Sequence, residues 1–259
     1  DLTASTGEVT ARLTAPWAVF VQGFVGGGSI TDGHMNDEDY SIPGDTVASI
    51  PYSNTISVKA PGDIPLYATI DIGRDWWRAP TYRLGTYVGY NYYRETMDAH
   101  GVTQLANPLG PLGPDVGGPI PPTGHAVITQ EATWQSLRLG VSAAFNLAPR
   151  VRLSADAAFL PYVEVDAEDR HYFGNTPDVA SINPLNGHGV GTQLEAMLTY
   201  DVAERWSIGI GARYWSMWTT EASMIRSFDA SGPADGPIQH LKIDTERAGV
   251  FGQVSYRFD

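Results

Sequence analysis

The chain of 259 residues contains no cysteine, which excludes a disulfide framework and thiol chemistry and leaves the redox compartment open. No apolar run reaches the roughly 18 residues that a membrane-spanning helix needs, and no basic segment followed by an apolar one resembles a signal peptide at the N-terminus. If the protein is exported, we expect this sequence to be its mature form. With 42% hydrophobic and 17% charged residues, the composition fits one large folded domain, 1–259.

Basic residues are also scarce. The chain has 16 Lys and Arg against 29 Asp and Glu, so its formal net charge is -13. This charge disfavours nucleic acid as a partner and favours a cationic peptide or protein. The sequence lacks a phosphate-cradling glycine loop, a Gly-x-Ser-x-Gly elbow and a histidine pair with metal-ligand spacing. We therefore expect no covalent or metal cofactor.

What the chain does contain is a repeated alternation of apolar residues with small or polar ones. Between Arg205 and Trp218, one side carries arginine, serine and glycine, whereas the other carries tryptophan, isoleucine and tyrosine. A period of two predicts a β-strand with one apolar face. The pattern predicts nine strands, at 9–13, 18–28, 66–72, 84–92, 136–145, 151–159, 194–202, 205–218 and 247–258.

The composition of the two faces indicates which kind of β-protein this is. A lipocalin-like soluble barrel would place its apolar face inside. Here the polar face is glycine, serine and arginine, which suits the crowded interior of a narrow barrel, and the apolar face then requires lipid. We expect Arg12, Arg138, Arg152 and Arg213 to form internal salt bridges with Glu8, Asp156, Glu195 and Asp201.

The connections between the predicted strands alternate between short and long. Tight links occur at 15–17, 78–82, 146–150 and 203–204, and long loops at about 30–64, 97–131, 164–190 and 219–243. This asymmetry is typical of outer-membrane barrels. Aromatic residues near the strand ends would form two interfacial girdles, with Trp17, Trp76, Trp77 and Trp206 by the short links and Tyr90, Tyr92, Trp134 and Trp218 by the long loops.

Two acidic clusters follow strand-like segments that should end at the same rim. In the second cluster, His171 could act as a base that activates water while Asp169 orients its imidazole. In the first, Asp37 and Asp39 would share a face, where neighbouring carboxylates can retain a proton that positions the water. Continued alternation from Val151 would place His171 on the lipid side, so we expect a bulge near Pro161.

These residues carry a resemblance to the omptin family of outer-membrane endopeptidases. Met35-Asn36-Asp37-Glu38-Asp39-Tyr40 resembles the family's Met-x-Asp-x-Asp-aromatic stretch, with Tyr40 in place of the usual Trp. Asp169-Arg170-His171-Tyr172 resembles its Asp-x-His-Tyr motif, and Tyr82 to Arg94 resembles the third-hairpin strand. The resemblance implies a ten-stranded antiparallel barrel in the bacterial outer membrane, with Asp37, Asp39, Asp169 and His171 as catalytic residues in loops that face outside.

The same resemblance implies that Tyr90 and Arg94 bind lipopolysaccharide, a candidate activating lipid, and that cleavage occurs near basic residues. The chain departs from the family at Ala167, where an acid is usual, and Asp166 and Glu168 are the candidate substrate-binding residues beside it. Only nine strands are readable, so the family's first strand is expected before Asp1. Either that strand was lost or cleaved, or the barrel closes differently. The alternative reading is a barrel without catalysis that serves as an adhesin, a lipid-binding protein or a structural component.

Overall fold

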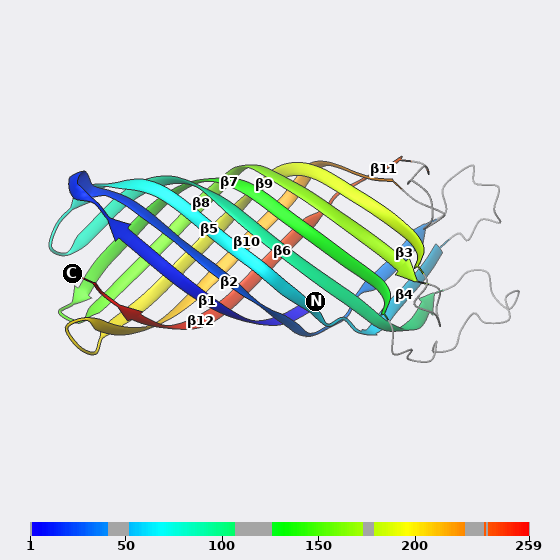
Figure 1. Ribbon diagram of the computed structural model, residues 1–259, viewed down its shortest axis with the longest axis horizontal. Helices are drawn as coiled ribbons and strands as arrows, with labels where there is room; N and C mark the ends of the chain where they lie inside the picture. Colours follow the sequence, from blue (N-terminus) through cyan, green and yellow to red (C-terminus); the bar gives the residue numbers. More distant parts are fainter. Residues whose placement is uncertain are drawn as a thin grey trace, which may run out of the picture.

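The computed structural model describes residues 2–40, 52–106, 126–172, 179–225, 236 and 238–258. Nearly all of them form one antiparallel sheet that curls into a barrel (Figure 1). The strands are β1 (Leu2–Thr14), β2 (Val19–Gly33), β3 (Asn36–Tyr40), β4 (Tyr52–Lys59), β5 (Gly62–Arg78), β6 (Tyr82–Ala106), β7 (Ala126–Ala148), β8 (Val151–Tyr172), β9 (Val179–Asp201), β10 (Trp206–Ile225), β11 (Ile238–Leu241) and β12 (Asp244–Tyr256), with a single 3-10 turn η1 (Pro16–Ala18).

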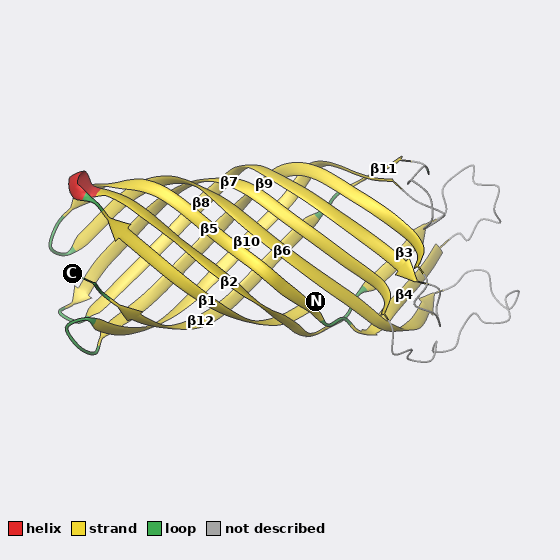
Figure 2. Ribbon diagram, in the orientation of Figure 1, coloured by secondary structure: helices red, strands yellow, loops and turns green. Residues whose placement is uncertain are grey.

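The long strands follow one another as an up-and-down meander. The order of neighbours is β1, β2, β5, β6, β7, β8, β9 and β10, and β12 pairs with β10. These are the nine strands that the alternation predicts. Figure 2 shows the tight connections gathered at one end, here called the short-turn end, and the short strands β3, β4 and β11 at the other, here called the long-loop end.

The strands run further than the sequence indicates. Much of the predicted loops at the long-loop end is strand, since β6 continues to Ala106 and β8 to Tyr172. These extensions carry polar residues on both faces, as in the hydrogen bond from Thr129 to Asp98, and so lack the alternation of a lipid-facing strand. Residues 41–51, 107–125, 173–178, 226–235 and 237 of the predicted loops lie outside the described residues.

The edges of the first and last long strands meet without pairing. With nine up-and-down strands, β1 and β12 run in the same direction, and no backbone ladder joins them among the described residues. The edges come within side-chain reach, because Gln253 donates a hydrogen bond of 3.3 Å to Thr10. The sheet is therefore open at this seam, and the tenth strand implied by the resemblance is not among the strands described.

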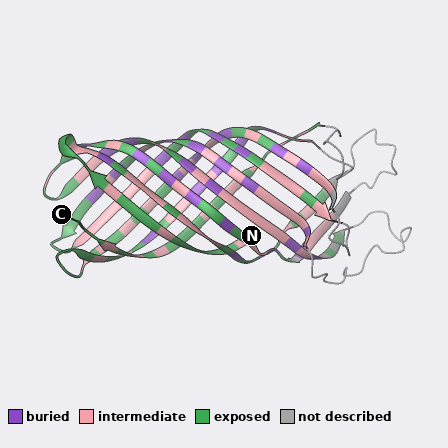
Figure 3. Cartoon of the chain, in the orientation of Figure 1, coloured by how far each residue is buried: buried purple, intermediate pink, exposed green. Residues whose placement is uncertain are grey.

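The outward face of the barrel is apolar. Green, exposed positions alternate with buried and intermediate ones along the strands in Figure 3. The large exposed apolar side chains include Val21, Ile70, Ile72, Val88, Leu139, Val141, Leu198, Ile208, Ile210, Val250 and Val254. An apolar band of this extent suits hydrocarbon and not water, as in a transmembrane barrel.

No helix in the described part of the chain is long and apolar enough to cross a bilayer.

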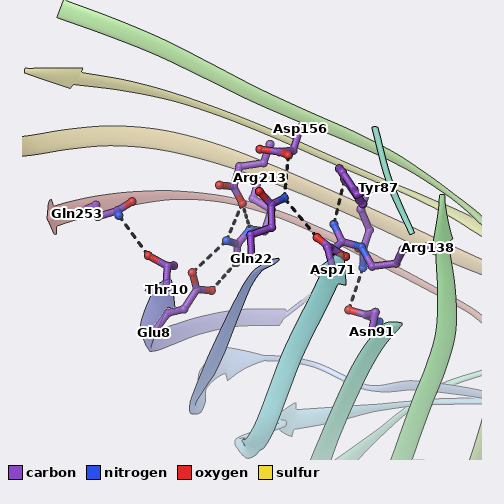
Figure 4. A network of polar contacts seen from close by, with 12 residues as sticks. Glu8, Thr10, Gln22, Asp71, Tyr87, Asn91, Arg138, Asp156, Arg213 and Gln253 are labelled. Atoms are coloured by element: carbon purple, nitrogen blue, oxygen red, sulfur yellow. Dashed lines mark hydrogen bonds and ion pairs between the residues drawn. The ribbon is translucent and has the colours of Figure 1, made fainter. Parts of the chain in front are cut away.

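The interior is polar towards the short-turn end, where charged side chains from different strands neutralise one another (Figure 4). Arg138 donates to both carboxylate oxygens of Asp71 at 2.8 Å. Arg213 contacts Glu8 at 2.6 Å and also Glu195, two of the acids expected to form internal salt bridges. Since buried charges are tolerated only when paired and hydrogen-bonded, these contacts make a filled interior possible.

Two of the four arginines pair with acids outside the predicted set. Arg138 pairs with Asp71, and Arg12 pairs with Asp75 at 2.8 Å. Asp156, which belongs to the set, accepts a hydrogen bond from Gln22. Alternation identifies which side chains point inwards, but the stagger between strands determines which of them meet, and one sequence does not reveal that stagger. Arg152 lies 4.0 Å from Asp201, an acid of the set.

Packing of the interior depends on glycines opposite aromatic rings. At Gly140, an added Cβ would lie 2.1 Å from Cζ of Tyr87, closer than a real contact allows. Farther towards the long-loop end, Trp215 stacks on Phe24 with ring centroids 5.9 Å apart and meets Tyr67 and Tyr93 edge to face. Side chains thus fill the barrel. The polar groups lie between this aromatic layer and the short-turn end, and the long-loop mouth lies on the other side of the layer.

Candidate active site

A bulge in β8 reverses which residues of its outer third point into the barrel. The pairing of β8 with β7 and with β9 shifts register at Pro161 and Tyr162. Below the shift Leu160 points inwards, and above it Val163 and Val165 point inwards, all three being fully buried. The bulge therefore restores Asp169 and His171 to the interior side of the strand, as the sequence analysis requires.

The Asp169 and His171 side chains meet at the long-loop end. Nε2 of His171 lies 2.7 Å from Oδ2 of Asp169. The side chains retain 35% and 20% of their exposure, so both groups are partly shielded yet reachable by water. One ring nitrogen is thus held by a carboxylate, which fixes the orientation of the imidazole.

The first acidic cluster lies on a separate hairpin at the same end of the barrel. β3 pairs with β4, and β4 pairs with the outer part of β6. Through β6 and β7 the hairpin belongs to the same continuous sheet as β8 (Figure 1). Asp37 is half-buried, and Glu38 accepts hydrogen bonds from Asn36 and Asn54. The side chain of Asp39 lies outside what the structure describes, and its backbone pairs with Ser53.

The two acids that flank Ala167 face away from the interior. Asp166 is exposed, and Glu168 forms an ion pair with Arg170 on the outer side of β8. The hydrogen bond to Glu168 raises the pKa of the Arg170 guanidinium above its ordinary value. The orientation does not fit the expectation that Asp166 and Glu168 contact a substrate beside His171, because neighbouring residues in a strand point to opposite faces.

A cavity of about 680 Å³ reaches two neighbours of Asp169, although neither Asp169 nor His171 lines it. Gln130, the cross-strand partner of Asp169, and Ala167, two residues before it, both line this cavity. Its other lining residues are Leu2, Glu95, Met97, Ala132, Trp134, Leu185 and the segment from Ile243 to Arg247. Its volume is that of an ordinary ligand site.

The polar group inside this cavity was not anticipated from the sequence. Glu95 forms an ion pair with Arg247 across the barrel and accepts a hydrogen bond of 2.9 Å from Tyr93. The alternation of Asn91, Tyr93 and Glu95 could have indicated that Glu95 points inwards. The strand predicted from the sequence ends at residue 92 and does not include Glu95.

The predicted lipid-binding residues lie on the outer surface. Arg94 forms an ion pair with Glu131 on the neighbouring strand, and the hydroxyl of Tyr90 donates to Gln135. Thr133 pairs with Arg94 across β6 and β7. The outward face of β6 therefore presents one guanidinium, already engaged with a carboxylate, and Tyr90 lies four residues away along the same strand.

Within the described ranges, no group of three or more histidine, cysteine, aspartate or glutamate side chains is arranged to hold a metal ion.

Comparison with known proteins gives a match at the level of structure. No protein-family model matches the sequence, and no curated protein matches it. Among solved structures, the chain is similar to the outer membrane protease OmpT from Escherichia coli, with a TM-score of 0.67 and 14% sequence identity over 93% of this chain and 79% of that chain. The fold is therefore that of an omptin-like outer-membrane β-barrel.

Proposed function

We propose that this protein is an omptin-like endopeptidase of the bacterial outer membrane, with its long-loop end facing outside the cell. The observation that carries the proposal is the 2.7 Å contact between His171 and Asp169, turned inwards by the bulge in β8 beside a cavity. The similarity in fold to a protease of that membrane adds support.

In the proposed reaction, water attacks the peptide carbonyl while His171 takes its proton, and the imidazolium then gives that proton to the leaving amine as the C–N bond breaks. Asp169 fixes the ring orientation and stabilises the imidazolium that forms, as a carboxylate beside a catalytic histidine does. Asp37 and Asp39 would position the water from the other wall, with one proton shared between their carboxylates. Proton transfer by a positioned imidazole contributes roughly 10²- to 10⁴-fold to a rate.

The proposed substrate is a cationic peptide cleaved near basic residues. The net charge of -13 favours the approach of such a peptide. The outward orientation of Asp166 and Glu168 leaves the cavity at Glu95 as the place where a substrate side chain could enter. Lipopolysaccharide is the proposed activating lipid, bound on the outer face at Tyr90 and Arg94.

The test is a cleavage assay on refolded protein in detergent. A peptide that contains Arg-Arg is incubated with the intact protein and with His171→Ala, each with and without lipopolysaccharide. Cleavage by the intact protein that falls at least about a hundredfold in the variant supports the proposal. His188→Ala is the matched control, because His188 is a histidine of the same rim whose imidazole faces Glu221 at 3.6 Å, and its rate should stay within about twofold of that of the intact protein.

A contrary outcome identifies the alternative. If the intact protein does not cleave the peptide in either condition, while circular dichroism confirms the barrel, the endopeptidase proposal fails. The scaffold would then act without catalysis, as an adhesin, a lipid-binding protein or a structural component.

A further inference from the structure

One arginine on the apolar outer surface has no counter-ion within the protein. Arg74 lies near the short-turn end of β5 and is exposed on the same outward face as Ile72. Its cross-strand partners are Val19 on β2 and Thr86 on β6, neither of which is charged. Within the described part of the chain, no carboxylate forms an ion pair with Arg74. A guanidinium in an apolar belt requires an anion or water as a partner.

The surroundings of Arg74 form a shallow groove. A cavity of about 370 Å³ is lined by Ile72, Gly73, Arg74, Trp76, Thr86, Tyr87 and Val88. The guanidinium lies 4.8 Å from the centroid of the Trp76 ring, a cation–π distance. The indole nitrogen of Trp76 donates a 2.8 Å hydrogen bond to Thr86, which fixes the ring.

A bulge in β5 adds a second aromatic side chain beside this groove. The pairing of β5 with β6 shifts between Asp75 and Trp77, and as a result the consecutive residues Trp76 and Trp77 are both exposed. Tryptophan prefers the level of the lipid headgroups. The groove therefore lies where the glycerol and phosphate groups of a phospholipid would be found, with aliphatic walls extending towards the bilayer centre.

Arg94 provides an internal contrast. It too lies on the outward face of the barrel, but towards the long-loop end, and the carboxylate of Glu131 neutralises it. Arg74 is the more exposed of the two and has no such carboxylate among the described residues. The difference indicates that the anion opposite Arg74 comes from outside the protein.

We infer that Arg74, held by Trp76, binds the phosphate of an anionic phospholipid in the membrane leaflet at the short-turn end. The guanidinium donates paired hydrogen bonds to the phosphate oxygens, and the acyl chains lie along Ile72 and Val88. Arginine matches phosphate geometry with two parallel donors, which favours it over lysine at such a site. The inference requires the membrane location only and is independent of catalysis.

The experiment is native mass spectrometry of the refolded full chain in a zwitterionic detergent. The protein is titrated with dioleoylphosphatidylglycerol, and separately with dioleoylglycerol, which lacks the phosphate. We expect one phosphatidylglycerol to be retained, and Arg74→Gln to weaken that binding roughly five- to tenfold, the loss of one charge-assisted contact. Trp76→Phe should weaken it less, and dioleoylglycerol should not bind at this site.

Arg150→Gln is the matched control, because it removes one exposed positive charge from the turn between β7 and β8 at the same end, outside the groove. Its affinity for phosphatidylglycerol should change less than about twofold. The inference is overturned if Arg74→Gln binds as the intact protein does, if Arg150→Gln weakens binding equally, or if dioleoylglycerol competes equally well. It is also overturned if Arg74→Gln weakens lipid A binding as much as Arg94→Gln does, since the site would then serve lipopolysaccharide.

Discussion

The two ends of the barrel use carboxylates differently. At the short-turn end, the Asp75 side chain has no exposed surface, and Arg12, Arg78 and Arg83 surround it at 2.8, 2.7 and 3.7 Å. At the long-loop end, Asp169 is partly exposed and contacts an imidazole. A guanidinium keeps its proton at any ordinary pH, whereas an imidazole exchanges its proton near neutrality. The first arrangement can only hold charge in place, and the second can move a proton.

The largest expected effect is on catalysis at the long-loop end. Asp169→Asn should lower the rate of peptide cleavage about a thousandfold, because the amide no longer holds the imidazole in the orientation and tautomer that a base needs. The free energy of unfolding should change by less than about 0.5 kcal/mol, since both side chains are partly solvated. Cleavage kinetics and urea unfolding of the same preparation measure both quantities. If the thousandfold loss in rate is accompanied by strong destabilisation, Asp169 also has a structural role, and the contrast between the carboxylates of the two ends does not hold.

The next largest effect is on stability at the other end. Asp71→Asn should lower the free energy of unfolding by about 3 to 5 kcal/mol, because it leaves the buried guanidinium of Arg138 without a charged partner. Urea unfolding, followed by tryptophan fluorescence in detergent, measures the change. Cleavage per folded molecule should remain within about twofold, as Asp71 lies far along β5 from the long-loop end. If cleavage falls as far as in Asp169→Asn, the interior charges belong to the catalytic apparatus.

A smaller effect is expected at the outer surface. Arg94→Gln should weaken lipopolysaccharide activation about tenfold, the loss of one charge-assisted contact with a phosphate. The concentration of lipopolysaccharide that gives half-maximal cleavage is the measurement. Arg74→Gln is the control, since it removes a lipid-facing guanidinium from the opposite end. Equal shifts in the two variants would mean that lipopolysaccharide responds to overall charge and not to this position.

The smallest effect tests the outward face of β8. Glu168→Gln should change cleavage less than twofold and stability by less than about 0.5 kcal/mol, because its ion pair with Arg170 is exposed. The same peptide assay and urea titration provide the values. A tenfold rise in KM for a basic peptide would instead restore Glu168 as a substrate-binding residue and would require β8 to turn in the bound state.

How far the fold could be predicted depends on the residue considered. Alternation was sufficient for the nine long strands, and the inward side of β10 at Arg213 and the outward side at Ile210 are as predicted. The ends of β6 and β8 were not predicted, because strands that project beyond the membrane carry no apolar stripe. The partner of Arg138 was not predicted either, because it depends on the stagger between strands.

The candidate site shows the same division. The spacing of Asp169 and His171 indicated that they share a face, and the need for a bulge near Pro161 followed from parity alone. The outward orientation of Asp166 and Glu168 follows from the same parity. The prediction that they bind substrate rests on their position next to Ala167 in the sequence and not on this parity. The ion pair of Glu95 with Arg247 joins residues 152 positions apart, and nothing local in the sequence marks them as partners.

The sequence by itself determined that this chain forms long antiparallel strands with an apolar outside and a polar inside, because side-chain direction in a strand depends only on position along the chain. It also determined that an imidazole and a carboxylate lie two residues apart and share a face where the chain is extended. Only the tertiary structure decided that this pair faces inwards near a cavity, which charges neutralise one another, and that Arg74 on the outer face has no ion-pair partner among the described residues. Those outcomes depend on stagger and on bulges, which are set by the closing of many strands together and not by any one of them.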